Sequence, residues 1–179
     1  MMASMARPSW GERRPATYVE LKAMAHPLRL RILRLCLDQA LTNKELADRL
    51  DRDPATVLHH VRTLVGTGFL VAEQVRAGAR GALEKPYRAT GKSWRLSIDD
   101  SPVDDQQRDH LAMVDALREE VADAGPERVK ILSRLGLLLS DQAAAELAGR
   151  LDDLIDELAG RDPDPAGRPY GLFLGLHEH

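Results

Sequence analysis

Hydrophobic side chains recur at helical spacing in three short stretches between residues 27 and 66. The first stretch begins at Pro27, the second follows Thr42 and the third follows Asp53. Within each stretch the spacing places the apolar side chains on one face, at Leu28, Ile32 and Leu35, at Leu46, Ala47 and Leu50, and at Val57, Val61 and Leu64. The pattern predicts three amphipathic helices, of which the first backs the other two.

Local signals mark where the second and third of these helices begin and end. Thr42 and Glu45 have the spacing of a capping box, Asp53 is a favourable N-cap, and proline is well tolerated at the first helical position that follows it. Gly66 and Gly68 are expected to end the third helix by adopting left-handed conformations. Two short helices joined by a tight turn form a helix-turn-helix, whose second helix typically enters the DNA major groove.

The next stretch predicts a β-hairpin. Phe69 to Val75 and Leu83 to Ala89 have the β-branched and aromatic content of strands. The connection between them is rich in glycine and alanine and carries Arg76, Arg80 and Lys85. A basic hairpin beside a recognition helix can contact the DNA backbone or minor groove, so we expect a wing.

Taken in order, the motifs AMAHPLRLRIL, LTNKELADRL, PATVLHHVRTLVGTGFLV and KPYRAT resemble winged-helix regulators of the arsenical-repressor (ArsR) type, over roughly Val19 to Trp94. The resemblance implies a dimeric, cytoplasmic, DNA-binding repressor or activator. It also implies base and phosphate contacts at Thr42, Pro54, Thr56, His59, His60 and Arg62 and at the cations of the wing. Metal-sensing members carry paired cysteines on the helix that reads LTNKELADRL here. This helix has none, and the single cysteine, Cys36, is expected to be a small buried residue.

The face of the third helix opposite its apolar stripe carries Ala55, Thr56, His59, Arg62 and Thr63, with His60 at its edge. These small or polar side chains can reach base edges and phosphates. We expect Thr56 and His59 to read bases and Arg62 to contact phosphate. The full candidate set for binding double-stranded DNA is Thr42, Asn43, Lys44, Pro54, Thr56, His59, His60, Arg62, Thr63, Arg76, Arg80 and Lys85.

Charge is distributed unevenly along the 179 residues, although the formal net charge is only −3. Residues 13–97 hold 16 Lys and Arg against 8 Asp and Glu, a balance of +8. Residues 98–179 hold 8 against 19, a balance of −11. The basic half can attract phosphates, whereas the acidic half is expected to face away from DNA.

The fold class is expected to be mainly α (α+β), with a disordered N-terminus at 1–15, a winged helix-turn-helix at 16–97, a linker at 98–105 and a C-terminal acidic module at 106–179. Helices are predicted at roughly Val103 to Ala122 and from Ser140 to about Ala159. Leu135 to Leu139 could extend a helix or form a strand, and Tyr170 to Leu176 is predicted to be a strand that could pair with it. The module is helical or α+β and serves dimerisation or effector binding. Heptad-like leucines offer a subunit interface or a packing face within the module, at Leu147, Leu151, Leu154 and Leu158.

Other classes of function find less support. The chain lacks the common nucleophile, phosphate-binding and zinc-protease motifs, so we expect no enzyme and no cofactor. No metal site is expected: His59 and His60 are adjacent on a helix and point apart, and His177 and His179 lie at the chain end. No apolar run spans a bilayer and no signal peptide is seen, so the cytoplasm is expected.

The main alternative is a winged-helix module that binds protein rather than DNA. Such a module should present an apolar or acidic face, whereas no acid lies between Pro54 and Phe69 and the wing is basic. We therefore favour a sequence-specific regulator, acting as a homodimer on a pseudo-palindromic promoter site and more often a repressor than an activator. A small-molecule effector in the acidic half is left open.

Overall fold

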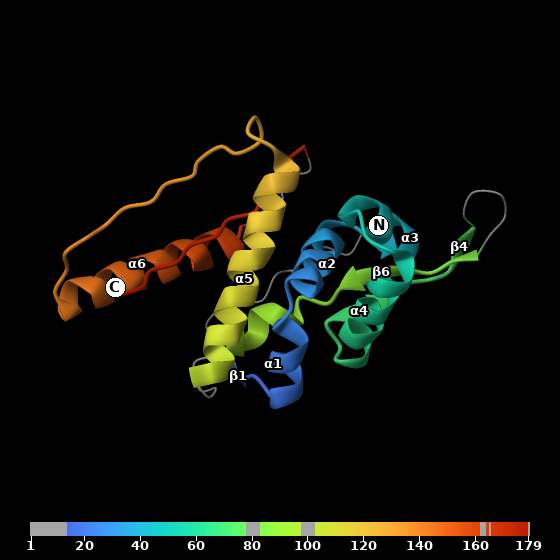
Figure 1. Ribbon diagram of the computed structural model, residues 1–179, viewed down its shortest axis with the longest axis horizontal. Coiled ribbons are helices and arrows are strands. Elements are labelled where there is room, and N and C mark those ends of the chain that lie inside the picture. Colours follow the sequence, from blue (N-terminus) through green and yellow to red (C-terminus); the bar gives the residue numbers. More distant parts are fainter. Residues whose placement is uncertain (1–13, 78–82, 98–102, 162–163, 165, 179) are drawn as a thin grey trace. The chain divides into compact units, whose positions relative to one another are not determined.

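The computed structural model describes residues 14–77, 83–97, 103–161, 164 and 166–178 (Figure 1). The chain divides into two compact units, one ending at Asp123 and the other continuing from Ala124. The first contains the helix-turn-helix and the wing, and the second contains one long helix and two extended stretches.

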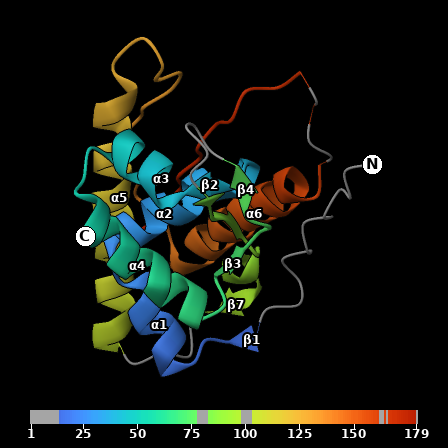
Figure 2. The same cartoon turned by 90° about the vertical axis from the view of Figure 1, so that its right-hand side faces the viewer.

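The first unit is built of helices and short strands (Figures 1 and 2). Its helices are α1 (Tyr18–Met24), α2 (Pro27–Asp38), α3 (Asn43–Leu50), α4 (Pro54–Gly66), the 3-10 helix η3 (Lys92–Arg95) and α5 (Val103–Ala124), whose last residue belongs to the second unit. Its strands are β1 (Arg14–Pro15), β2 (Leu41–Thr42), β3 (Leu70–Ala72), β4 (Arg76–Ala77), β5 (Leu83–Glu84), β6 (Pro86–Ala89) and β7 (Leu96–Ser97).

A small antiparallel sheet of order β2-β6-β3 leads into the wing. Leu70 to Ala72 pair with Ala89 to Tyr87, and Arg76 and Ala77 then pair with Glu84 and Leu83. The prediction of a hairpin at these positions is confirmed. Figure 1 shows β4 reaching outward from the helices.

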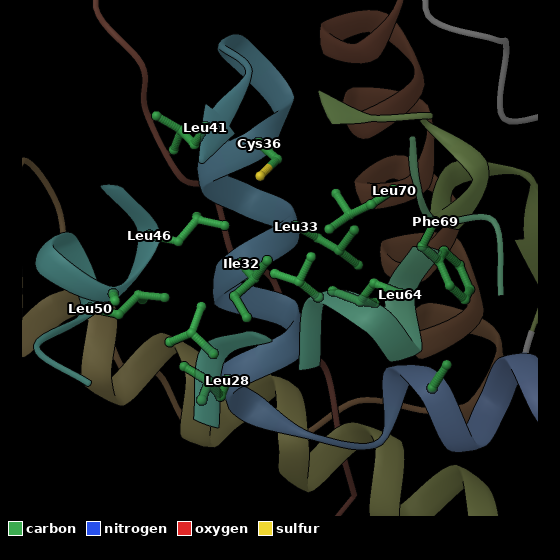
Figure 3. Close-up of a cluster of buried hydrophobic side chains, with 14 residues drawn as sticks. Leu28, Ile32, Leu33, Cys36, Leu41, Leu46, Leu50, Leu64, Phe69 and Leu70 are labelled. Carbon is green, nitrogen blue, oxygen red and sulfur yellow. The ribbon is translucent and has the colours of Figure 1, made fainter. Parts of the chain in front are cut away.

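The hydrophobic core lies between α2, α3, α4 and β3 (Figure 3). The stripe predicted for α4 is its buried face, because Val57, Val61 and Leu64 are fully enclosed. Cys36 is also fully enclosed, as expected, and burial raises the pKa of its thiol to about 12. Cys36 is therefore an unreactive residue that packs in this core.

The predicted helix starts are confirmed in detail. The Thr42 hydroxyl accepts from the Glu45 amide at 3.2 Å, while the Glu45 carboxylate accepts from the Thr42 amide at 2.7 Å. Asp53 caps α4. One expectation is wrong, however: Gly66 is the last residue of α4, and only Gly68, with φ of +74°, is left-handed.

Helix α5 packs on the winged helix instead of joining the C-terminal unit, to which the sequence assigns it. Ala112 and Ala116 are buried on its inner face. Arg31 of α2 is buried and forms ion pairs with Glu119 and Asp123 of α5. This packing places α5 alongside α2 within the first unit (Figures 1 and 2).

The N-terminal segment is also more ordered than expected where it is described. Residues 14 and 15, assigned to a disordered N-terminus, form β1 and pair in parallel with β7. Residues 1–13 lie outside the described part of the chain.

The second unit contains α6 (Asp141–Ala159), whose predicted start is confirmed: the Ser140 hydroxyl accepts from the Ala143 amide at 3.2 Å. The strand predicted at Tyr170 to Leu176 is wrong for the single chain, and Leu135 to Leu139 forms neither helix nor strand. A strand needs a neighbour for its hydrogen bonds, and the described chain pairs neither stretch. The fold is nonetheless α+β with an N-terminal winged helix-turn-helix, as predicted. No described helix has the length and apolar character to cross a membrane.

Candidate nucleic-acid interface

Helix α4 exposes the polar face that its sequence predicts. Thr56, His59 and Arg62 are exposed, and Thr63 is half-buried with its hydroxyl donating to the His59 carbonyl at 3.2 Å. The buried stripe on the opposite face fixes this orientation. The side chains proposed to read bases and contact phosphate therefore share one accessible surface.

The two N-termini of the helix-turn-helix are held together by Asn43. Its side-chain amide donates to the Pro54 carbonyl at 2.9 Å, which joins the first turn of α3 to the first turn of α4. Lys44 is exposed beside it, and Pro54 is exposed at the start of α4. Asn43 thus sets the spacing between the two helices. Because its side chain is half-buried, only part of Asn43 is open to a ligand.

Thr42 is not available as a DNA contact. Its side chain is buried and is used in the capping box of α3. The resemblance and the position of Thr42 at a helix start both pointed to phosphate binding. The structure corrects this, because the hydroxyl already satisfies a backbone amide of its own helix.

His60 is the second correction. It is only 7% exposed and packs against His26, with ring centroids 4.4 Å apart, and its Nδ1 has no partner among the described residues. Burial lowers the pKa of His60 to about 4, and His26, Arg29 and His59 act in the same direction. A neutral, buried imidazole is part of the packing between α4 and α2, so His60 cannot contact a base or phosphate in this conformation.

The wing cations differ in their surroundings. Arg76 donates to both carboxylate oxygens of Glu45, at 2.8 and 2.9 Å, and lies 3.6 Å from Glu84. Lys85 is exposed between β5 and β6, and Arg80 lies outside the described residues. Arg76 therefore ties the base of the wing to α3, a role that sequence reasoning did not assign to it.

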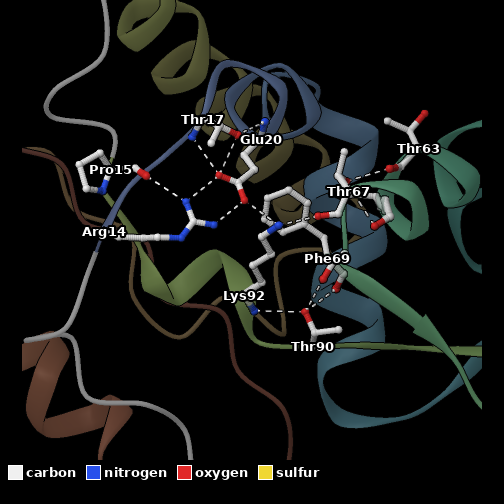
Figure 4. Close-up of polar contacts among 11 residues, drawn as sticks. Arg14, Pro15, Thr17, Glu20, Thr63, Thr67, Phe69, Thr90 and Lys92 are labelled. Carbon is white, nitrogen blue, oxygen red and sulfur yellow. Dashed lines mark hydrogen bonds and ion pairs between the residues drawn. The ribbon is translucent and has the colours of Figure 1, made fainter.

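An ion pair network around the buried carboxylate of Glu20 supports the far end of α4 (Figure 4). Lys92 of η3 donates to the Thr67 carbonyl, the C-cap of α4, at 2.6 Å and lies 2.6 Å from the carboxylate of Glu20. Glu20 is 6% exposed and also pairs with Arg14. The hydrogen bond from Arg14 is the main reason why the pKa of Glu20 is lowered. The prediction missed these residues, although Thr17 and Glu20 have the same capping-box spacing as Thr42 and Glu45.

Three carboxylates near this surface are engaged in contacts. Glu45 is bonded to Arg76, Glu73 to Arg88, and Asp53 caps the amides of Ala55 and Thr56. The exposed polar side chains of α4 thus lie beside neutralised acids and exposed cations such as Lys44 and Lys85. In the described part of the chain, no group of three His, Cys, Asp or Glu side chains is arranged to hold a metal ion.

The geometry is that of a winged helix-turn-helix: α3, a tight turn with Asp51 at φ of 49°, α4, and a β-hairpin wing. Residues 24–72 match the family described as a helix-turn-helix domain. The match covers α2 to β3 and stops before the wing. The chain matches no curated protein.

Several solved structures share parts of this arrangement at low identity. Reduced HlyU from Vibrio cholerae is 24% identical over 54% of this chain and 80% of its own, with a TM-score of 0.34. ZitR from Lactococcus lactis is 17% identical over 75% and 83%, also with a TM-score of 0.34. The adhesin competence repressor AdcR from Streptococcus pyogenes is 18% identical over 74% and 80%, with a TM-score of 0.33. At these TM-scores the likeness supports no statement about the function of this chain.

Proposed function

We propose that this protein is a DNA-binding transcriptional regulator that acts in the cytoplasm as a homodimer, most simply as a repressor of a pseudo-palindromic site. The observation that carries the proposal is the exposed, acid-free face of α4, with Thr56, His59 and Arg62 side by side and their helix fixed by a buried stripe. Such a face fits the major groove, where polar side chains read base edges. It does not fit an apolar protein partner.

Each element has a separate task in the proposed complex. The exposed N-terminus of α4 and Lys44 contact phosphates, Thr56 and His59 lie against base edges, and Arg62 contacts the backbone. Lys85 contacts DNA from the wing, whose base Arg76 holds against α3. Bound promoter DNA would then be closed to polymerase.

The test is fluorescence anisotropy with the purified chain, a duplex from its own upstream region and a random duplex, at several salt concentrations. We expect tighter binding to the upstream duplex and a steep loss of affinity with salt, whose slope gives the number of neutralised phosphates. Equal, weak binding to both duplexes would contradict self-regulation and call for selection of the preferred site from a random library. The absence of binding to either duplex at low salt would overturn the proposal and favour a protein-binding module.

Single substitutions separate the two kinds of contact. Arg62→Ala should weaken binding to every duplex, whereas Thr56→Ala or His59→Ala should lower the preference for the selected site, by roughly 1–3 kcal/mol for a good base contact. Arg161→Ala, which removes an exposed arginine outside the winged helix, is the matched control for charge. Unchanged site preference in His59→Ala would contradict the role assigned to His59.

A further inference from the structure

The second unit contains two extended stretches, residues 131–139 and 171–176 (Figure 1). Both present apolar side chains to solvent. In the first stretch Leu135 is 77% exposed and Leu138 is fully exposed. In the second, Leu172, Leu174 and Leu176 are all partly exposed and alternate with their neighbours, as the residues of one strand face do. Soluble proteins rarely leave contiguous apolar surface of this extent uncovered, so these stretches call for a partner.

The backbone of both stretches also lacks the hydrogen bonds of a helix or strand. Neither 131–139 nor 171–176 belongs to a helix or strand in the described chain, and no hydrogen bond joins them. In an extended chain Leu135, Leu137 and Leu139 share one side of the first stretch, and Leu172, Leu174 and Leu176 share one side of the second. Leu138 and Phe173 lie on the opposite sides. Each stretch lacks a hydrogen-bonded neighbour and a cover for its apolar side chains. Each can supply both to the other.

We propose that residues 131–139 of one chain form a β-ladder with residues 171–176 of a second copy, and that the reciprocal ladder closes a two-fold dimer. The proposal deepens the homodimer of the proposed function and assigns it an interface. An isologous dimer uses both stretches of both chains, so each strand gains one hydrogen-bonded neighbour and the two ladders can pack their apolar faces against each other.

The area is appropriate for a stable dimer. If a leucine-sized side chain presents roughly 100 Å² of apolar surface, the exposed apolar side chains of the two stretches amount to roughly 600 Å² per chain. Backbone and flanking atoms add to this value. A standard interface buries about 800 Å² per partner, so the two stretches supply most of what is needed.

Charge permits a second copy to pair at these stretches, although the C-terminal half as a whole is acidic. Residues 98–179 are strongly acidic, yet 128–140 and 165–177 are each 13 residues long without a carboxylate, and they are the longest such stretches in that half. They carry Lys130, Arg134 and Arg168. Pairing them brings two acidic units together without placing carboxylates against each other.

Disulfide trapping between full-length single-cysteine variants tests the pairing directly. Leu137→Cys is mixed under reducing conditions with Leu172→Cys, Leu174→Cys or Leu176→Cys and then oxidised. Because Cys36 is fully buried, the wild-type chain is a silent control. We expect at least one mixture, but neither of its components alone, to give a product of twice the 19.8 kDa chain mass.

Light scattering over a range of concentrations measures the oligomeric state of the unmodified chain. We expect a dimer. Leu137→Glu should raise its dissociation constant roughly 100-fold, because an unpaired carboxylate would enter the interface. Gln142→Glu adds the same charge on exposed α6 and should leave the constant unchanged within about twofold.

Three results would overturn the proposed pairing. They are a monomer at every concentration, a dimer unaffected by Leu137→Glu that gives no mixed disulfide, and an intrachain disulfide at monomeric mass when both cysteines are placed in one chain. DNA binding is measured on the same samples. Loss of the pairing with retained DNA binding refutes only the interface, whereas a trapped dimer that ignores DNA refutes the proposed function and leaves the interface standing.

Discussion

The winged helix buries its regularly spaced apolar residues, whereas the C-terminal unit leaves many of its own exposed. In the winged helix, the stripes of α2, α3 and α4 meet one another and the sheet, and their central side chains are fully enclosed. In the C-terminal unit, leucines of equal regularity stay in contact with solvent. An apolar pattern identifies a surface that must be covered, but only the structure reveals whether the cover lies in the same chain.

The largest expected effect tests that contrast with one type of substitution at two sites. Leu46→Ala removes a fully enclosed side chain and should lower the free energy of unfolding of the winged helix by about 3 kcal/mol, through lost burial and a cavity. Leu138→Ala, at a fully exposed site, should leave that unfolding free energy unchanged. Urea denaturation followed by circular dichroism measures both. Equal losses at the two sites would mean that the two units are stabilised as one.

The second prediction uses the histidines of the two regions. His60 is buried and its pKa is lowered to about 4, so between pH 6.5 and pH 4 the unfolded chain binds a proton that the folded chain does not. Stability should therefore be fully present above that window and fall by about 3 kcal/mol as the pH drops through it.

Stability measured against pH for the wild type and for His60→Phe checks this expectation, since the variant should lose most of the slope. His177→Phe, at an exposed position of the C-terminal unit, should retain it. A slope that persists in His60→Phe would assign the effect to His26, whose pKa is lowered as well, chiefly by burial.

A third comparison concerns the two helix caps with matching geometry. Thr42 and Ser140 each accept one backbone amide at 3.2 Å. Thr42→Ala should cost the winged helix about 1 kcal/mol, while Ser140→Ala should reduce the helicity of α6 and leave the melting of the winged helix in place. Thermal melts monitored by near-UV and far-UV circular dichroism separate the two outcomes. A shift of the winged-helix transition in Ser140→Ala would show that α6 supports it.

The smallest expected effects belong to surface ion pairs. Arg76→Ala breaks the pair with Glu45 that holds the wing, and Arg161→Ala breaks the pair with Glu157 within α6. Each should cost about 0.5 kcal/mol or less, because exposed pairs are well screened by water and salt. Chemical denaturation provides the stability values. Only Arg76→Ala should also alter DNA affinity, since it frees the base of the wing, and equal DNA affinity in both variants would argue against that link.

Local rules account for most of what the sequence predicted correctly. The capping box at Thr42, the Asp53 cap and the apolar stripe of α4 involve residues within four positions of one another, so the starts and buried faces of these helices could be inferred. The candidate interface was inferred to the same extent, because the exposed face of α4 is simply the complement of its stripe.

Two errors at Thr42 and Gly66 were local, but the others arose where the deciding contact lies far along the chain. His60 looks like an edge residue of α4, but its burial depends on His26. Arg31 gives no sign in the sequence that Glu119 and Asp123 enclose it, so the assignment of α5 to the winged helix could not be anticipated. The strand at Tyr170 to Leu176 has a correct alternation, but no partner is described within the chain.

The parallel pairing of β1 with β7 has a practical consequence for work on the DNA-binding part alone. An expression fragment that begins at α1 would lack Arg14, which pairs with the same carboxylate that Lys92 uses while it caps α4. Its recognition helix would then be tethered less firmly at the C-terminal end, and affinities measured on it would understate those of the intact protein. A fragment for crystallography or screening should therefore begin upstream of Arg14 and extend through α5.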